Sequence, residues 1–238
     1  MGYPLGDVIG GRLRQFLVIE GLIGVGKTTL CRLLQETWNA KLILEPAETN
    51  PFLGPFYSDP ERYAFSAQMF YLVNRWRQQD TIRQPELFAD MVVSDYLFAK
   101  DRLFAEKTLN EMELELYDRF AAALGEMTPT PDLVVYLEAD IDTIMGRIAE
   151  RQAVGETAIT RGYLEDLKAR YDRLWENYSD SPILRMSNED LNYRDDRTAR
   201  ERVLWRIKNA LAGNPDGEPP GFKTDREVQT SLFTGSRE

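Results

Sequence analysis

Short apolar runs alternate with longer amphipathic stretches along most of the chain. Apolar residues recur three and four positions apart in FSAQMFYLVNRW (65–76) and YLEDLKARYDRLW (163–175), which predicts helices. The short runs have the length and composition of buried strands: FLVIE (16–20), KLILE (41–45), MVVSD (91–95), LVVYLEA (133–139) and ILRM (183–186). This alternation predicts an α/β fold, a doubly wound, five-stranded parallel sheet with helices on both faces. Ligands of such sheets bind beyond the carboxyl ends of the strands.

The composition changes at both ends of this alternating region. Residues 1–15 are rich in glycine and predict a loose lead-in. Residues 212–238, which include AGNPDGEPPGFKTDREVQTSLF, form a Pro/Gly-rich tail without helical periodicity. The sequence of 238 residues therefore predicts one α/β domain, residues 16–211, with an appendage at each end.

Charge and rare residue types exclude several functions. The chain has 29 Lys and Arg against 39 Asp and Glu, a net charge of −10, which disfavours non-specific binding to nucleic acid. It has no histidine, which excludes Ser-His and Cys-His nucleophilic catalysis, and its single Cys31 excludes an intrachain disulfide and a multi-cysteine zinc site.

Membrane attachment is not indicated either. No apolar stretch approaches the roughly 20 residues that span a bilayer, and the N-terminus lacks a signal-peptide core. Gly6 stands where a myristoylation motif requires Ser or Thr. We therefore expect a soluble, cytoplasmic protein.

A phosphate-binding loop follows the first predicted strand. Gly21-x-x-x-x-Gly26-Lys27-Thr28 satisfies the Walker A pattern, with a strand before it and a helix after it. We expect Lys27 to reach the β- and γ-phosphates and the Thr28 hydroxyl to ligate Mg²⁺. The candidate ATP-binding residues are Gly21, Leu22, Ile23, Gly24, Val25, Gly26, Lys27, Thr28 and Thr29.

A carboxylate ends the second predicted strand, beside this loop. Glu45 is followed by Pro46, which stops the strand. A carboxylate in that crevice can accept a proton from an attacking hydroxyl group. The alternative is a solvated acid at a strand end.

The stretch EPAETNPFLGPFYSDPERYAFSAQMFYLVNR (45–75) resembles the deoxynucleoside kinase family, which includes bacterial deoxyguanosine and deoxyadenosine kinases. The resemblance implies a P-loop kinase fold with a lid, and Mg²⁺-ATP as phosphoryl donor. It implies that Glu45 is the general base for the sugar 5′-hydroxyl and that Tyr57 contacts the 3′-hydroxyl. It also implies that Gln68 pairs with the base edge, for which an amide is suited because it both donates and accepts. A helix-surface amide is the alternative for Gln68.

The stretch MVVSDYLFAKDRLFAEKTL (91–109) departs from the common family pattern. Many members carry an acid followed by Arg-Ser, whereas this chain has Ser94-Asp95-Tyr96, which resembles bacterial purine deoxynucleoside kinases. Asp95 thus replaces the arginine that steadies the catalytic glutamate. Asp95 is a candidate ligand of Mg²⁺ or a contact to a purine, and Lys100 or Arg102 is the candidate replacement for the missing cation.

The stretch MGRIAERQAVGETAITRGYLEDL (145–167) resembles the family lid. Arg147 and Arg151 are four residues apart and share a helix face, so both are candidates for stabilising the transferred phosphoryl group. The alternative is surface arginines paired with Glu150 or Asp142. Glu156 matches the glutamate that shares the 3′-hydroxyl with Tyr57. SNEDLNYRDD (187–196) matches the loop that touches the ATP adenine.

The resemblance covers residues 16–211 and predicts ATP-dependent phosphorylation of the 5′-hydroxyl of a deoxynucleoside, with deoxyadenosine or deoxyguanosine favoured. It also implies a homodimer. The alternatives are a pyrimidine-preferring member and a nucleoside monophosphate kinase. The latter needs a cationic clamp near the second strand, where Glu45 has the wrong charge.

The tail predicts a candidate function of a different class. Gln229-Thr230-Ser231-Leu232-Phe233 resembles the Q-x-x-L-F peptides that dock on the bacterial DNA sliding clamp. The alternative is an apolar tail that folds back on its own domain or on a dimer mate.

Overall fold

The computed structural model describes residues 15–45, 49–83, 91–125, 128–151, 159–187 and 192–214. In these residues, five parallel strands form one sheet in the order β2-β3-β1-β4-β5. The strands are β1 (Gln15–Gly21), β2 (Lys41–Ile43), β3 (Met91–Ser94), β4 (Leu133–Leu137) and β5 (Ile183–Met186). β1 pairs with β3 on one side and β4 on the other, so the strand order changes direction at β1: β2 and β3 are added on one side of it and β4 and β5 on the other. A crevice for ligands is expected at this switch point.

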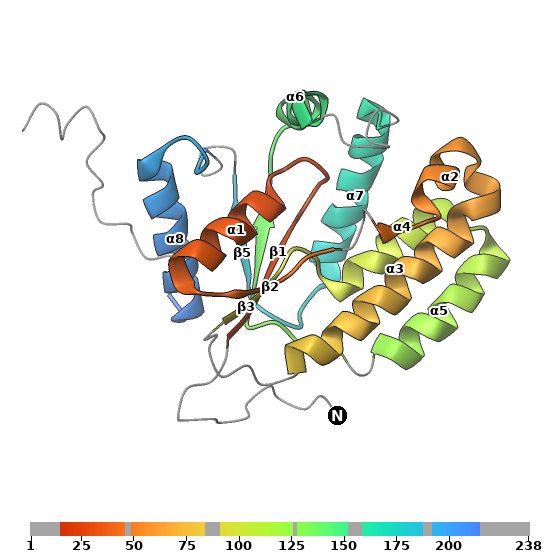
Figure 1. Ribbon diagram of the computed structural model, residues 1–238, viewed down its shortest axis with the longest axis horizontal. Helices are drawn as coiled ribbons and strands as arrows, with labels where there is room; N and C mark the ends of the chain where they lie inside the picture. Colours follow the sequence, from red (N-terminus) through yellow and green to blue (C-terminus); the bar gives the residue numbers. More distant parts are fainter. Residues whose placement is uncertain are drawn as a thin grey trace, which may run out of the picture.

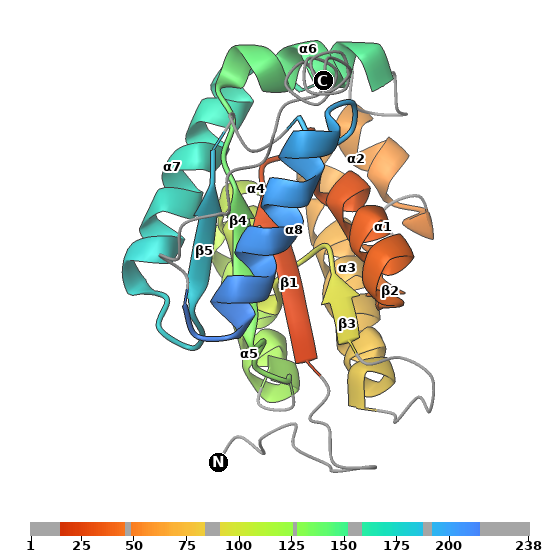
Figure 2. The ribbon, with the colours of Figure 1, turned by 90° about the vertical axis from the view of Figure 1, so that its left-hand side faces the viewer.

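Helices cover both faces of the sheet (Figure 1). One face carries α1 (Lys27–Trp38) and α8 (Arg197–Leu211), which stand in front of the strands in Figure 2. The other face carries α3 (Pro60–Arg83), α4 (Asp101–Thr108), α5 (Glu111–Gly125) and α7 (Arg161–Asn177). The shorter α2 (Leu53–Ser58) precedes α3, and α6 (Ile141–Arg151) lies across the carboxyl end of the sheet, as both views show.

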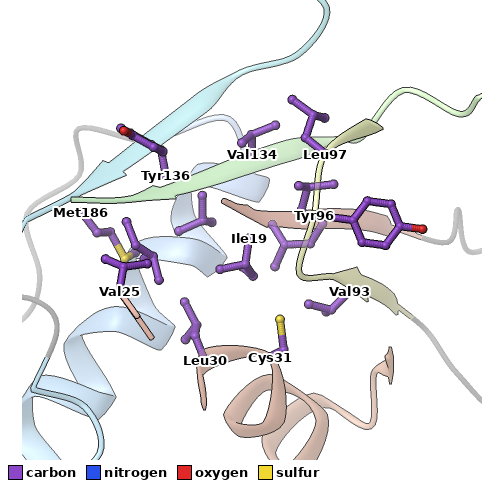
Figure 3. Packing of buried hydrophobic residues seen from close by; sticks show 14 of the residues in the cluster. Ile19, Val25, Leu30, Cys31, Val93, Tyr96, Leu97, Val134, Tyr136 and Met186 are labelled. Carbon is purple, nitrogen blue, oxygen red and sulfur yellow. The ribbon is translucent and has the colours of Figure 1, made fainter. Parts of the chain in front are cut away.

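The central strands are buried on both sides. Leu17, Ile19 and Val93 are 0% exposed, as expected for a parallel sheet covered by helices on both faces. Leu30 and Cys31 of α1 point toward Ile19 in the core (Figure 3). A second, smaller cluster lies under α3, α4 and α5, around the fully buried residues Leu72, Ala105 and Tyr117.

The turn between β1 and α1 depends on glycine at Gly21. Gly21 has φ 145°, and a Cβ placed there would lie 2.5 Å from the Leu137 carbonyl oxygen of β4. The contact is with backbone, so it could be relieved only by moving the strand. Gly24 and Gly26 also have positive φ, 81° and 116°. The loop can therefore take this path only with glycine at these positions.

The predicted fold class is confirmed, with small differences at the strand ends. β2 ends at Ile43 rather than at residue 45, so Glu45 lies two residues beyond the strand. β3 ends at Ser94, and Asp95 follows it directly. β4 ends at Leu137, two residues earlier than predicted. In the part of the chain that the structure describes, no helix is both long and apolar enough to cross a membrane.

Replacing Gly21 by alanine is expected to destabilise the protein by about 1–3 kcal/mol, because the new Cβ meets the Leu137 carbonyl at a strained φ. Gly146 in α6 is the matched control, since a Cβ there has no atom within 4 Å. Gly146→Ala should stabilise the helix by about 0.5–1 kcal/mol. Urea unfolding of both variants measures the difference. Equal stability of the two variants would contradict the steric argument.

Candidate active site

The P-loop curls around the side chain of Lys27. The Lys27 ammonium donates to the carbonyl oxygens of Gly21 (2.8 Å) and Leu22 (3.0 Å). Burial, followed by the nearby Lys100, lowers the pKa of Lys27. α1 begins at this lysine, so the positive end of the helix dipole faces the same loop. The loop therefore has the backbone and charge of a phosphate site.

α6 and the segment that contains Tyr193 both contact the P-loop. Arg147 of α6 donates from Nη1 to the Val25 carbonyl (2.8 Å), and the Tyr193 hydroxyl donates to the Gly26 carbonyl (3.0 Å). Arg147 is thus anchored beside the phosphate site. Arg151 is exposed and is the last residue of α6.

Asp95 connects the P-loop to the segment that carries Glu45. Its Oδ2 accepts from the Thr28 hydroxyl (3.1 Å), and its Oδ1 accepts from the backbone N–H of Glu45 (2.7 Å). Burial raises the pKa of Asp95. Because its Oδ2 contacts the candidate Mg²⁺ ligand Thr28, this geometry favours Asp95 as a ligand of Mg²⁺ over a contact with the nucleobase.

The same pair offers hard oxygen ligands for Mg²⁺. Mg²⁺ is usually held by one or two protein oxygens, with substrate phosphates and water completing its shell. The Thr28 hydroxyl and the Asp95 carboxylate, which contact each other beside the P-loop, would supply these one or two protein oxygens.

Two buried cations hold the Glu45 carboxylate. Its Oε1 forms an ion pair with Nη2 of Arg75, and its Oε2 lies 3.5 Å from Nζ of Lys100. Both cationic side chains are only 3% exposed. Burial favours the neutral acid, but Lys100 and Arg75 outweigh it and lower the pKa of Glu45 to about 2. Glu45 is therefore an ionised, oriented carboxylate that can accept a proton.

Lys100 is in turn fixed by Glu20, the last acid of β1 before the P-loop. Glu20 is 0% exposed, and its Oε1 lies 3.6 Å from the Lys100 ammonium. The same Oε1 accepts from the backbone N–H of Leu97 (2.7 Å). Its Oε2 accepts from the Gly21 N–H (2.9 Å) and the Tyr171 hydroxyl (2.8 Å). Lys100 thus bridges two carboxylates, Glu20 and Glu45.

Lys100 and Arg75 lie beside Glu45, where the family arginine is missing. The alternative, Arg102, is wrong, because its side chain is 57% exposed and its guanidinium pairs with Glu106 (2.6 Å) and Asp118 (3.0 Å). Sequence reasoning missed Arg75 and Glu20. For Arg75 a signal existed, since it follows Gln68 by seven residues and therefore shares its helix face.

Arg75 is held on both sides of its guanidinium. Nη1 pairs with Asp101, and the rings of Tyr71 and Tyr96 lie 5.3 Å from its central carbon. Burial would lower the pKa of Arg75, but Asp101 and Glu45 raise it. Arg75 therefore stays charged in the interior and connects α3 to Glu45.

The other predicted acceptor residues are only partly described. Gln68 is 6% exposed on α3 and donates from Nε2 to the Thr108 hydroxyl (3.1 Å). Its Oε1 is buried without a hydrogen-bond partner among the described residues. The backbone of Tyr57 is in α2, and its side chain lies outside what the structure describes. Glu156 and Pro46 also lie outside the described residues, as does Gln229–Phe233.

Comparison with known proteins shows the family of this chain. A family model described as "Deoxynucleoside kinase" matches residues 17–212. The chain belongs to the deoxynucleoside kinase family. It is 31% identical to the deoxyguanosine kinase of Bacillus subtilis over 201 residues, which is 82% of this chain and 97% of that protein. It is 30% identical to the deoxyadenosine kinase of Lactobacillus acidophilus over 211 residues, 83% of this chain and 96% of that protein.

Solved structures give the same fold. The structure of deoxyadenosine kinase from M. mycoides with bound dATP superposes with a TM-score of 0.70 at 22% sequence identity. The match covers 82% of this chain and 100% of that chain. The P-loop kinase fold of the deoxynucleoside kinases is therefore present here.

In this deoxynucleoside kinase, Lys100→Met is expected to destabilise the fold by about 3–5 kcal/mol, because Glu20 loses its buried counter-charge. Arg102→Met is the matched control, and the loss of its exposed ion pairs should cost about 1 kcal/mol or less. Urea unfolding at neutral pH measures both. Equal losses in the two variants would show that Lys100 is not the buried counter-ion of this cluster.

Proposed function

We propose that this chain transfers the γ-phosphoryl group of Mg²⁺-ATP to the 5′-hydroxyl of a purine deoxynucleoside, deoxyadenosine or deoxyguanosine. The observation that carries the proposal is the oriented Glu45 carboxylate, which Asp95 connects directly to the P-loop threonine. A base and a phosphate-binding loop that are held together are suited to transfer of a phosphoryl group from a nucleotide to a hydroxyl group. The proposal includes Mg²⁺, a homodimer and a cytoplasmic location.

Glu45 acts as the base in this reaction. It accepts the proton of the 5′-hydroxyl while the oxygen forms a bond to the γ-phosphorus and the bond to the leaving oxygen of ADP breaks. Because Arg75 and Lys100 keep the pKa of Glu45 at about 2, it is a weak base.

The donor side supplies positive charge. Lys27, Arg147 and Arg151 are the cations proposed to offset charge on the transferred group, and Arg147 is already anchored to the P-loop at Val25. Mg²⁺ held by Thr28 and Asp95 would neutralise the β- and γ-phosphate oxygens. The loop residues Leu22, Ile23 and Thr29 complete the proposed ATP site.

The acceptor side fixes the sugar and the base. Tyr57 and Glu156 are proposed to bind the 3′-hydroxyl, and Gln68 the base edge. Two observations favour a purine: the Ser94-Asp95-Tyr96 sequence, and relatives named as deoxyguanosine and deoxyadenosine kinases. A pyrimidine-preferring enzyme is the nearest alternative, because one relative from Bacillus subtilis is a deoxyadenosine/deoxycytidine kinase.

A monophosphate acceptor fits the site less well. Arg75 and Lys100 lie near the end of β2, and both are neutralised by carboxylates, those of Glu20, Glu45 and Asp101. A second phosphate in the acceptor would therefore meet paired charges rather than a cationic clamp.

The proposed function predicts that Glu45→Gln lowers kcat for the preferred deoxynucleoside by about 100-fold or more, with the KM for ATP unchanged, since removal of a general base costs about 10²–10⁴. Glu138→Gln is the matched control, because Glu138 follows β4 at the same edge of the sheet and pairs with the exposed Arg185. The assay uses deoxyadenosine, deoxyguanosine, deoxycytidine and thymidine with Mg²⁺-ATP. Turnover of pyrimidines alone would reject the purine assignment, and full activity of Glu45→Gln would reject the base.

We propose that the homodimer forms through α5. Met112, Leu116 and Phe120 lie four residues apart on one side of α5 and are 80%, 44% and 46% exposed. α5 lies at the outer edge of the helical layer, so this apolar stripe is open to a second copy (Figure 1). Apolar side chains in such a stripe are typical of the centre of a homodimer interface.

The double variant Met112→Glu, Phe120→Glu is expected to be a folded monomer, because two acids cannot be buried against their own copies across a twofold axis. The double variant Glu115→Ala, Arg119→Ala removes an exposed ion pair from the same helix and should remain a dimer. Light scattering after gel filtration gives both masses. A wild-type monomer, or a dimer in the Glu variant, would contradict this interface.

Binding of Gln229–Phe233 to a DNA sliding clamp stays a separate proposal, carried by sequence alone. Deletion of residues 225–238 and a clamp-binding assay test it. Unchanged affinity for the clamp would reject the tail motif.

A further inference from the structure

α3 and α4 run antiparallel and meet along a seam with polar pairs at both ends. Gln68 of α3 pairs with Thr108 of α4, and seven residues further along α3, Arg75 pairs with Asp101. Between these pairs lies the buried cluster that contains Leu72 and Ala105. Gln68 and Arg75, at the two ends of this seam on α3, are therefore each positioned by a partner on α4.

The hydrogen bonds at Thr108 decide how the Gln68 amide is oriented. The Thr108 hydroxyl donates its only proton to the Phe104 carbonyl one turn earlier (2.8 Å). In this arrangement the hydroxyl accepts from Gln68, which places the amide nitrogen toward Thr108 at an Nε2–Oγ1 distance of 3.1 Å. The amide oxygen is thereby turned away from α4.

That oxygen is left without a partner in the part of the chain that the structure describes. Gln68 is 6% exposed, and its Oε1 is buried and unpaired. A buried acceptor without a donor costs about 1–3 kcal/mol, which a ligand with an N–H group would offset. Gln68 lies on the same face of α3 as Arg75, whose guanidinium reaches Glu45. The unpaired acceptor is therefore on the side of α3 that faces the proposed acceptor site.

We propose that Thr108 is a specificity-determining residue that locks the Gln68 amide in one orientation and so distinguishes 6-aminopurine from 6-oxopurine deoxynucleosides. The inference rests on the proposed function. A 6-amino base offers a donor at the exocyclic position and an acceptor at the ring nitrogen, whereas a 6-oxo base offers the reverse. An amide that can rotate serves both patterns, but a locked amide serves only one. Thr108 itself does not contact the substrate.

Thr108→Val is the decisive variant, because valine keeps the shape of threonine but cannot accept the Gln68 hydrogen bond. Thr108→Ser is its matched control, because serine keeps the hydroxyl. Deoxyadenosine and deoxyinosine are the substrates to compare, since they differ only in the amino or oxo pattern. For the wild type we expect at least a tenfold difference in kcat/KM between them. Thr108→Val should reduce this difference to threefold or less, mainly through the nucleoside KM, and Thr108→Ser should retain it.

The KM for ATP is expected to be the same in all three proteins, which separates a change in base specificity from a general loss of active enzyme. An unchanged substrate ratio in Thr108→Val, or a ratio lost equally in Thr108→Ser, would overturn the role of Thr108. A wild type that does not discriminate between the two substrates would overturn it as well. A wild type that phosphorylates no deoxynucleoside would overturn the proposed function and, with it, this inference.

Discussion

The structure depends on a cluster of buried charges at the carboxyl end of the sheet. Glu20, Glu45 and Asp101 meet Lys100 and Arg75 there, and four of these five side chains are 3% exposed or less. Isolated charges at such depth are strongly unfavourable, so each must keep its partner. The partners come from β1, α3, α4 and the segments after β2 and β3. The cluster therefore fixes how these elements meet.

This arrangement explains how the proposed base, Glu45, is held beside the P-loop. Glu45 lies beyond the end of β2 and outside regular structure. It is held by Arg75 and Lys100 through its side chain and by Asp95 through its backbone. Since Asp95 also binds Thr28, a single carboxylate links the P-loop to the backbone of the proposed base. Preorganisation of this kind is what phosphoryl transfer requires, because positioning and charge provide most of its catalysis.

The sequence predicts the elements well and the contacts between them poorly. The five strands, the P-loop and the nearness of Glu45 to it follow from apolar runs and from a local motif. Arg75 and Glu20 were missed because each lies within a predicted helix or strand. Their contacts with the site come from partners far along the chain, which the local sequence does not indicate. Lys100 directly precedes α4 and Arg102 is its second residue, so the choice between them depends on how the start of α4 is oriented toward the sheet, which the local sequence does not determine. Thr108 has no sequence signal, since its role follows from the orientation of one hydroxyl proton.

The central claim is that the buried charge cluster orients Glu45 as the proposed base, with Lys100 linking it to Glu20. The measurement that tests it most directly is a double-mutant cycle on kcat with Glu20→Gln, Lys100→Met and the double variant, each assayed with saturating ATP and the preferred deoxynucleoside. The account predicts that both single variants lose activity and that the double variant loses no more than the worse single one, a coupling of about 1 kcal/mol or more. Losses that add in the double variant would show that the two residues act independently, and the account of the buried cluster would be wrong.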